Sequence, residues 1–337
     1  MSESVKQKKL AVIILNWNGL NILKEFLPKV AETTRGDAVD LIVADNGSDD
    51  GSAQWVAENY PDIKLLRFSE NFGFSEGYNR AIRATAYPYT LLLNSDVATP
   101  EGWWQPLLDF MEKNPDVGAA QPKIMSYRQP EKFEYAGAAG GLIDRLGYPY
   151  CRGRVFDSIE TDHGQYDSAP ADIAWASGAA LMVRSALYIK LGGLDPKFFA
   201  HMEEIDLCCR IHGAGYRVCV VPGSKVFHLG GGSLPYGNPR KTYLNFRNNL
   251  LLLHKNLPRG RGRFILFTRR LADTLAFGLF LVKGQWDDAR AVLKAHRDFR
   301  HMRRQYNSLP HRDTMRSLPG ADRFIVLSHF LKRKKKL

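Results

Sequence analysis

The chain has 337 residues, of which 45% are hydrophobic, and this composition excludes a wholly disordered protein. Its length accommodates one large α/β domain with an appendage, or two modest domains. The net charge is +12, but residues 240–337 hold 24 Lys and Arg against six Asp and no Glu, so the positive charge is concentrated near the C-terminus. A basic end of this kind indicates an anionic partner surface.

The cysteines, the N-terminus and the apolar segments of the chain indicate the cellular compartment of the protein. The four cysteines are Cys151, Cys208, Cys209 and Cys219. They form no CxxC pair, so we expect free thiols in a reducing environment. The polar N-terminus lacks a signal-peptide pattern, and the apolar segment 264–282 contains three charged residues, too many for a spanning helix. We therefore expect a cytoplasmic protein.

Apolar runs alternate with helical patterns over the first 93 residues. Buried strands are predicted over residues 10–15, 41–44, 63–68 and 90–93, and helices over 21–33, 52–60 and 74–86. Ser48 or Asp49 is predicted to cap the second of these helices. The alternation predicts an α/β fold, with a mainly parallel sheet flanked by helices.

The remaining chain is less regular. Residues 119–170 are rich in Gly and aromatic residues and show no clear period. Beyond them, strands are predicted over residues 172–183 and 216–221, and helices over 203–212 and 243–257. The Arg-Gly-Arg-Gly-Arg stretch after Pro258 is predicted to be a linker. The chain is thus divided into a main domain, residues 1–257, and a basic, amphipathic helical extension, residues 258–337.

Polar side chains follow three of the predicted parallel strands, among them Asn16, Asp45 and Asp96. Such strand ends form the ligand-binding edge of parallel sheets. Asp96 is a candidate ligand for a cation that bridges phosphates, or else a helix cap before Pro100. Asp45 is a candidate acceptor for ribose hydroxyls or a base N–H, or else part of an Asp-Asn-Gly-Ser turn.

Three carboxylates, Glu203, Glu204 and Asp206, fall within four residues at the start of a predicted helix. Crowding raises the pKa of one carboxyl group, which suits a general base. The alternative is a solvated helix start that pairs with Arg210.

Two further segments have features of ligand-binding loops. His228 precedes the glycine-rich residues 229–233, and is either a metal ligand or a structural histidine. These glycines permit close approach of phosphate. Residues 71–79 enter a helix whose first amides can face a nucleotide, although an ordinary capped helix explains them too. No Gly-Lys-Ser/Thr loop and no GxGxxG turn is present, which argues against a P-loop or dinucleotide-binding protein.

The order of these motifs resembles the family 2 glycosyltransferases of the GT-A (Rossmann-like) fold, over about residues 9–257. The motifs are Asn-Trp-Asn, VADNGSDDGS, NFGFSEGYNRAI, LLLNSDV, W-x-SGA, HMEEIDLCCR and VFHLGGGS. Rhamnosyltransferase-like bacterial members are the most similar. The resemblance implies a metal-dependent, inverting transfer of a sugar from a nucleotide-sugar, with dTDP-L-rhamnose favoured. The acceptor would be a hydroxyl of a cell-surface polysaccharide or lipid-linked oligosaccharide.

The resemblance also implies residue roles. It places Asn16, Asp45, Gly73, Gly77, Asn79, Asn94 and Arg247 around the nucleotide and its diphosphate. It makes Asp96 and His228 ligands of Mg²⁺ or Mn²⁺, since Asn94 stands where the family's DxD motif usually has its first Asp. It puts Trp175, Ser177 and Gly178 beside the acceptor. Glu204 is the expected base, with Glu203 as its neighbour and alternative.

The basic extension, with apolar stretches at 276–282 and 324–330, predicts peripheral attachment to the inner face of the cell membrane. A solvated helical extension or an oligomer contact remains the alternative. Two rival functions are a non-catalytic nucleotide-sugar or glycan-binding module and a nucleic-acid-binding protein. No zinc-finger or RNA-recognition signature supports the second, so no nucleic-acid partner is expected.

Overall fold

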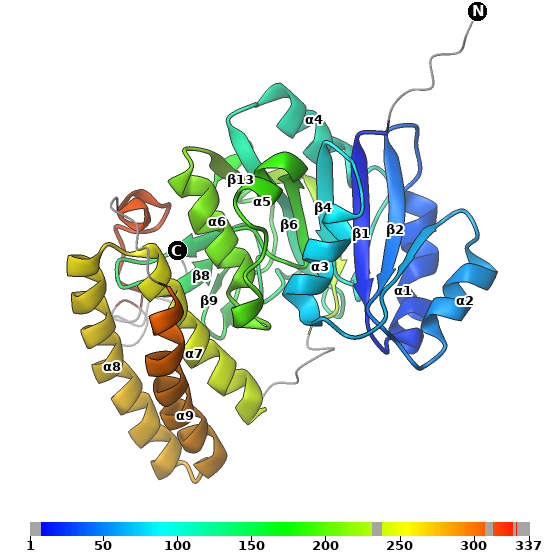
Figure 1. Cartoon of the computed structure of the whole chain (residues 1–337). Helices are drawn as coiled ribbons and strands as arrows, with labels where there is room; N and C mark the ends of the chain where they lie inside the picture. The colour runs from blue at the N-terminus through cyan, green and yellow to red at the C-terminus, as the bar shows by residue number, and fades with distance from the viewer. Residues whose placement is uncertain (1–7, 231–237, 307–312, 326–327, 329–337) are drawn as a thin grey trace, which may run out of the picture.

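A computed structural model describes residues 8–230, 238–306, 313–325 and 328 (Figure 1). It consists of an α/β core, with a group of long helices from the C-terminal part of the chain on one side. Part of the glycine-rich loop, residues 231–237, and the basic end, residues 329–337, lie outside the described residues. The predicted apolar stretch 324–330 is described only in part.

Within the described residues, nine strands form the central sheet, in the order β11-β13-β6-β12-β4-β1-β2-β3, with β5 paired to β13. Strands β1, β2, β3 and β4 are parallel neighbours, and β6 and β13 are parallel to each other, while β12 is antiparallel to β4 and β6. The prediction of a mainly parallel sheet is confirmed. The bounds are β1 Leu10–Asn16, β2 Val39–Asp45, β3 Lys64–Arg67, β4 Tyr89–Leu93, β5 Val97–Ala98, β6 Val117–Ser126, β11 Ala171–Asp172, β12 Ala180–Arg184 and β13 Arg217–His228.

Helices lie on both faces of this sheet, and a group of long helices from the C-terminal part of the chain lies beside it (Figure 1). The bounds are α1 Leu20–Thr33, α2 Ser52–Asn59, α3 Gly73–Arg83, α4 Gln105–Lys113, α5 Ser185–Lys190, α6 Glu203–Gly213, α7 Pro239–Asn256, α8 Arg259–Val282 and α9 Trp286–Met302, with 3-10 helices η1 Pro196–Phe198, η2 Arg303–Gln305 and η3 Thr314–Ser317. The helices predicted in the first 93 residues and at 203–212 and 243–257 are confirmed with shifted ends.

Strand β1 shows why the sheet forms. Its side chains alternate, so that Ala11 and Ile13 belong to the core on the α3 face, whereas Leu10, Val12 and Ile14 belong to the core on the α1 face. All five are essentially inaccessible to solvent. A strand buried on both faces reads as a continuous apolar run, which is the pattern of this segment.

A second sheet of four short strands, in the order β10-β9-β8-β7, occupies the region that showed no period. The bounds are β7 Gly141–Ile143, β8 Pro149–Cys151, β9 Arg154–Val155 and β10 Ser158–Ile159. Strands of two or three residues are too short to show an alternating pattern, so the sequence did not predict them.

Three local predictions are wrong. The strand expected over 172–183 is two strands, β11 and β12, separated by the Ser-Gly-Ala step. The residue before α2 is Gly51, with φ of 83°, in place of the predicted Ser48 or Asp49, and the Ser48 hydroxyl accepts instead from Asn16 Nδ2 and the amide of Asn18. The Arg-Gly-Arg-Gly-Arg stretch is no linker: it forms the first turns of α8, directly after Pro258.

The extension shares a core with the α/β domain. Leu250 and Leu253 of α7, Ile265 of α8 and Phe299 of α9 are buried in the same cluster as the side chains beneath the sheet. The division into a main domain and a separate extension, residues 258–337, therefore stays a prediction. All four cysteines are free and buried, as expected. None of the described helices has the length and apolar run that a membrane crossing requires.

Candidate active site

The strand directions bring the predicted polar residues to one edge of the central sheet. Asn16 pairs with Asp45 at the ends of β1 and β2, and Asn94 directly follows β4. His228 ends β13 and pairs with Val97 of β5, which places it beside Asp96. Since β13, β6, β4, β1 and β2 all run in the same direction, these residues leave the sheet at its carboxyl edge.

Asp45 is held in a fixed orientation. Asn16 Nδ2 donates to Asp45 Oδ1 at 3.1 Å and to the hydroxyl of Ser52 at 2.8 Å. The amide of Ser48 donates to Asp45 Oδ2 at 3.1 Å, so the turn chemistry proposed for this segment is present. Asn16 Oδ1 is buried and accepts no hydrogen bond within the described residues. This edge therefore offers an acceptor to a ligand N–H or O–H.

The loop that enters α3 lies against the end of β2. Asn46 accepts from the amide of Phe72 at 3.1 Å and donates to Asn71 Oδ1 at 2.9 Å. Gly73 has φ of +78°, a conformation that favours glycine. A side chain at Gly77 would meet Leu15 at 2.9 Å, so glycine permits close packing of α3 on the sheet. The two glycines thus bring the loop next to Asp45.

Asp96 and His228 form a buried ion pair, with Asp96 Oδ1 3.1 Å from His228 Nε2. Burial lowers the pKa of His228, but the nearby carboxylates of Asp96 and Glu134 outweigh this effect and raise the pKa to about 10. Burial likewise opposes the charge of Asp96, yet its pKa is lowered because His228 donates to it. Asn94 Nδ2 lies 3.5 Å from the same Nε2 atom.

The donors present suit a divalent cation that is shared with a substrate. Within the part of the chain that the structure describes, no three His, Cys, Asp or Glu side chains are placed to hold a metal ion by themselves. Asp96 and His228 supply one oxygen and one nitrogen. Mg²⁺ is commonly held by one or two protein ligands together with phosphate oxygens and water, so this pair fits such an ion.

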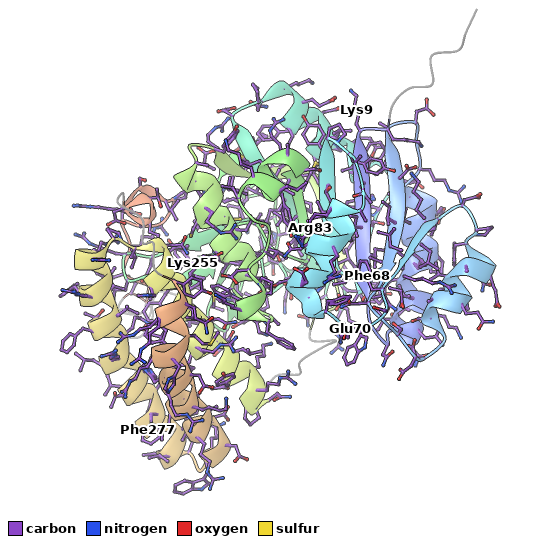
Figure 2. All side chains as sticks on the ribbon, in the orientation of Figure 1. Lys9, Phe68, Glu70, Arg83, Lys255 and Phe277 are labelled. Carbon is purple, nitrogen blue, oxygen red and sulfur yellow. The ribbon has the colours of Figure 1, made fainter. Side chains whose placement is uncertain are left out.

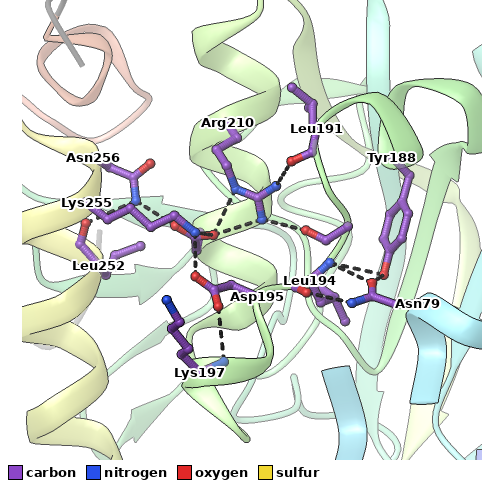
Figure 3. Close-up of polar contacts among 12 residues, drawn as sticks. Asn79, Tyr188, Leu191, Leu194, Asp195, Lys197, Arg210, Leu252, Lys255 and Asn256 are labelled. Atoms are coloured by element: carbon purple, nitrogen blue, oxygen red, sulfur yellow. Dashed lines mark hydrogen bonds and ion pairs between the residues drawn. The ribbon is translucent and has the colours of Figure 1, made fainter. Parts of the chain in front are cut away.

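The carboxylates at the start of α6 divide into two groups. Asp206 is fully buried and accepts from Lys255 Nζ at 2.8 Å, Arg210 Nε at 2.9 Å and Asn256 Nδ2 at 2.9 Å. Figure 3 shows this network between α6, α7 and the loop at Asp195. Arg210 therefore pairs with Asp206, and the network fixes α6 from the side facing the extension.

Glu203 and Glu204 have no such partners. Each has a buried Oε2 atom that makes no hydrogen bond within the described residues. Burial raises the pKa of Glu204 to about 7. Burial, and next the charge of Glu204, raise the pKa of Glu203 well above its usual range. Because both pKa values are raised, the pair can hold a proton near neutral pH.

The Ser177-Gly178-Ala179 segment, between β11 and β12, connects Glu204 with the Asp96–His228 ion pair. The Cα of Gly178 faces Glu204 and Phe74, and a side chain there would lie 3.8 Å from both. The next residue, Ala179, accepts a hydrogen bond from the amide of Asn94 at 3.0 Å. Successive contacts thus link Glu204, through Gly178 and Asn94, to His228.

Residues 11–162 match the sequence profile of glycosyl transferase family 2. This match spans 152 of the 337 residues, so the N-terminal part of the chain is similar to this family. An N-acetylglucosaminyl-diphospho-decaprenol L-rhamnosyltransferase of Mycobacterium tuberculosis is 28% identical over 237 residues, covering 65% of this chain and 75% of that protein. A low-salt glycan biosynthesis hexosyltransferase of Haloferax volcanii is 22% identical over 249 residues, covering 72% of this chain and 74% of that protein.

Solved structures show the same fold. The chain superimposes on Staphylococcus aureus TarS 1–349 in complex with UDP-GlcNAc with a TM-score of 0.56 and 15% identity, covering 85% of this chain and 81% of that one. A mannosyltransferase of Pyrobaculum calidifontis in complex with GDP-Man and Mn²⁺ gives a TM-score of 0.51 and 17% identity, covering 87% of both chains. The predicted GT-A fold is confirmed.

Some residues expected to contact ligands have other partners in this structure. Asn79 accepts from Tyr188 Oη at 2.7 Å and from the amide of Leu194 at 3.0 Å, and it joins α3 to α5 (Figure 3). Trp175 is 5% exposed and donates to the Leu142 carbonyl at 2.9 Å. These contacts favour structural roles for Asn79 and Trp175, because their polar atoms are already engaged within the fold.

Arg247 and Ser177 are likewise turned toward the protein. Arg247 donates to the carbonyl of Phe198 at 2.8 Å and to Asn248 Oδ1 at 2.8 Å, so its guanidinium does not have the free edge expected of a diphosphate ligand. The Ser177 hydroxyl donates to the carbonyl of Ala136 at 2.9 Å. Of the three residues expected beside the acceptor, Gly178 is the one that lies next to Glu204.

Glu134 belongs to the site, although the sequence analysis did not single it out. Its Oε1 atom lies 3.7 Å from His228 Nδ1, and its Oε2 atom accepts from the amide of Ala136. Gly230, with φ of +68°, passes close to the same carboxylate. The residue lies in the aperiodic region, where nothing in the local pattern distinguished it.

Asn248 holds the strained segment that precedes the base. Phe199, His201 and Met202 have φ between 67° and 75°, which is costly for residues with side chains. Asn248 is fully buried, and its Nδ2 donates to the carbonyls of Phe198, Ala200 and His201 at 2.7–2.9 Å. This one amide therefore sets the start of α6.

Replacing Asn248 by Ala is expected to lower both stability and turnover. The loss of buried hydrogen bonds should reduce the free energy of unfolding by about 2–4 kcal/mol, and the displaced base should reduce kcat about 10- to 100-fold. Denaturant titration and initial rates measure the two effects. Asn249→Ala is the matched control, since Asn249 donates only to Gly147 at 3.1 Å, away from α6. Equal losses of kcat in both variants would contradict the positioning role.

Proposed function

We propose that the chain is a metal-dependent, inverting glycosyltransferase that transfers a sugar from a nucleotide-sugar to an acceptor hydroxyl. The observation that carries the proposal is the series of contacts that links Glu204, through Gly178 and Asn94, to the Asp96–His228 pair. A base and an acidic cation site on one surface are what a single displacement at an anomeric carbon requires.

In this mechanism each group has a separate task. Asp45, oriented by Asn16, accepts hydrogen bonds from the nucleoside. Glu204 takes the proton of the acceptor hydroxyl, and the oxygen attacks the anomeric carbon from the side opposite the leaving diphosphate. Since one displacement occurs, the anomeric configuration inverts. Glu203 keeps its proton and leaves the negative charge on its neighbour.

Asp96 and His228 would hold Mg²⁺ or Mn²⁺, which supplies positive charge to the leaving diphosphate when bound. Such an ion would need the neutral form of His228, because a protonated ring nitrogen has no lone pair to offer to a cation. Asn94, whose amide group lies beside His228, is then placed to contact ribose or phosphate.

A donor panel tests the proposed function. The protein is incubated with Mn²⁺ or Mg²⁺ and dTDP-L-rhamnose, UDP-GlcNAc or GDP-mannose, and release of the nucleoside diphosphate is scored. We favour dTDP-L-rhamnose, with a lipid-linked or polysaccharide acceptor of the cell envelope, because of the similarity to the mycobacterial rhamnosyltransferase. Binding of a donor without any turnover, with every acceptor class, would instead support a nucleotide-sugar-binding module.

We also propose that the extension attaches the enzyme to an anionic membrane surface, the inner face of the cell membrane. Helix α8 exposes an apolar stripe at helical spacing, which continues at the start of α9. The stripe comprises Phe264, Phe267, Leu271, Leu275, Leu279, Val282 and Trp286, each more than half exposed. Arg263, Arg270 and Lys283, also exposed, lie along the same helix. Figure 2 shows side chains projecting from this part of the extension, with Phe277 near its tip.

The double substitution of Phe267→Glu and Leu275→Glu is expected to abolish vesicle binding. Each apolar side chain contributes about 1.5–3 kcal/mol when buried, so partition should fall about 100-fold or more. Sedimentation with vesicles containing phosphatidylglycerol measures the effect. Ile189→Glu, at a half-exposed apolar residue of α5, is the control. If the wild-type protein does not sediment with the vesicles, membrane attachment is excluded. If its mobility instead shifts with RNA in a salt-sensitive way, and it does not bind vesicles, a nucleic-acid partner is favoured.

A further inference from the structure

A cavity of about 330 Å³ lies between the small sheet, the edge of the central sheet and the C-terminal segment that contains Arg323. Its lining consists of Leu142 of β7, Arg152 of the turn between β8 and β9, Tyr166, Asp172 of β11 and Arg323. Two of these five side chains are cations. The cavity is therefore a candidate site for an anionic ligand.

This cavity is separate from the active site. Asp172 pairs with Cys219, which lies near the beginning of β13, whereas His228 is the last residue of that strand. Most of the length of β13 thus lies between the cavity and the Asp96–His228 pair. None of the lining residues has a task in the proposed sugar transfer, so a ligand bound in the cavity would occupy a second site.

Arg152 is a half-buried cation that is held in place by its neighbours. Its amide donates to the carbonyl of Gly140 at 2.9 Å, and its guanidinium lies over the ring of Tyr166, 5.0 Å from the centroid. The Tyr166 hydroxyl in turn donates to Glu160 at 3.2 Å. Burial lowers the pKa of Arg152, and Tyr166 opposes this effect. Among the described residues, no carboxylate offsets the cost of burying this charge.

Arg323 reaches the cavity from the C-terminal segment. Its carbonyl accepts from the amide of Arg145 at 2.9 Å, and the amide of Ile325 donates to Asp144 at 3.1 Å. Both bonds connect the segment to the turn after β7. They fix the backbone at Arg323 beside the small sheet, so that the two arginines approach the cavity from different segments.

The charges that line the cavity are not balanced. Within the described residues, neither the Arg152 nor the Arg323 guanidinium has an ion pair or a hydrogen bond. Asp172, the carboxylate of the lining, accepts instead from Arg217 at 2.9 Å. A guanidinium presents a planar fork of donors that matches the oxygens of a carboxylate or a phosphate. Two such groups beside one cavity favour an anion between them.

The volume of the cavity indicates the size of the ligand. A water molecule takes up about 30 Å³, so an inorganic ion would leave most of the cavity to water. Pockets for small organic molecules begin at about 300 Å³ and have largely apolar linings with a few polar groups. Leu142 and the ring of Tyr166 supply an apolar part here. The cavity therefore suits an organic molecule with one anionic group.

We propose that this cavity binds a small organic anion, a carboxylate or a phosphate on a body about the size of a monosaccharide, and that Arg152 and Arg323 hold its anionic group. This second site goes beyond the proposed sugar transfer and does not depend on it. Because one arginine belongs to the small sheet and the other to the C-terminal segment, the bound anion joins these two parts of the chain.

Isothermal titration calorimetry of the full chain tests the site. Glucuronate and glucose 1-phosphate represent the two anion classes, while glucose and inorganic phosphate represent the body and the anion alone. EDTA is present, so that no cation-dependent phosphate binding contributes. Arg152→Gln and Arg323→Gln should each weaken binding about 10- to 100-fold, the effect of losing hydrogen bonds to a charged group.

Arg316→Gln is the matched control. Arg316 is an exposed arginine of the same C-terminal segment and is not part of the lining, so its replacement should change binding less than about twofold. The Arg323 side chain is exposed as well, and Arg323→Gln therefore tests the site even if Arg152→Gln fails to fold.

The outcomes separate the two anion classes. Tighter binding of glucuronate assigns a carboxylate ligand, and tighter binding of glucose 1-phosphate assigns a phosphorylated one; both support the site. Unchanged binding in Arg323→Gln would overturn it, as would the absence of binding by either anion. Glucose that binds as tightly as the anions, or inorganic phosphate that binds as tightly as glucose 1-phosphate, would also overturn the proposal. Displacement of the ligand by dTDP with Mn²⁺ would place the anion in the active site instead.

Discussion

Replacing Glu204 by Gln is expected to reduce kcat about 10²- to 10⁴-fold, because the variant lacks the group that takes the acceptor proton. Donor binding should change little, since the donor is proposed to contact Asp45 and the Asp96–His228 pair and not Glu204. Steady-state rates and a nucleotide-binding isotherm on the same preparation separate the two quantities. Near wild-type turnover in Glu204→Gln would exclude this residue as the base.

The neighbouring carboxyl group provides the control. Glu203 is proposed to keep its proton, since burial and the charge of Glu204 raise its pKa, and the amide of Glu203→Gln resembles a protonated carboxyl group. We therefore expect less than about a threefold change in kcat for Glu203→Gln. A large loss in Glu203→Gln with little loss in Glu204→Gln would reverse the two assignments.

The pH dependence follows from the same pair. Burial raises the pKa of Glu204 to about 7, and the base is active only when it is ionised. In wild-type protein kcat/KM should therefore rise with pH through about 7 and then level off. The residual activity of Glu204→Gln should lack this rise.

Replacing Asp96 by Asn is the second substitution with a large expected effect. It removes the negative charge that binds the cation and pairs with His228, so turnover should fall about 10²- to 10³-fold, as when other electrostatic stabilisers of a transition state are removed. The Mn²⁺ concentration for half-maximal nucleotide release should rise as well.

An exposed carboxylate at the same edge of the sheet serves as the comparison for Asp96. Asp49 lies in the turn after β2, and Asp49→Asn should retain the wild-type rate and Mn²⁺ response. Unchanged Mn²⁺ dependence in Asp96→Asn would show that the cation is held elsewhere, or that none is needed.

The fold was predictable where the chain has strong periodicity. The apolar run 10–15 is long enough to identify a strand buried on both faces, and each later strand of the first 93 residues follows a helix of clear amphipathic pattern. Because parallel strands end at one edge, the positions of Asn16, Asp45 and Asp96 at those ends also predicted their proximity.

The remaining parts depend on contacts between distant segments. Glu134 lies between β6 and β7, outside the named strands, so no local pattern distinguished it in the sequence. Arg247 was expected at the diphosphate from its resemblance to a family position, but its guanidinium faces the carbonyls of Lys197 and Phe198. Helix periodicity alone does not reveal which partner a buried polar group finds, because the partner comes from another element.

The acidic residues at the start of α6 were likewise predicted only in part. The sequence predicted that crowding would perturb a carboxyl group, and the two neighbours Glu203 and Glu204 do have raised pKa values. Arg210 was given as an alternative partner of the cluster, but the contact of Asp206 with Lys255 was not predicted, since Lys255 lies 49 residues away in the chain. The long-range pair leaves the other two carboxyl groups for the site.

The most direct measurement is an anomalous-difference map from crystals grown with Mn²⁺ and the nucleoside diphosphate that binds best. The account predicts one strong manganese peak about 2 Å from Asp96 and His228, with the nucleoside at Asp45 and Glu204 facing the same hollow. A manganese peak and nucleotide on another face of the molecule, remote from Asp96 and Glu204, would contradict it.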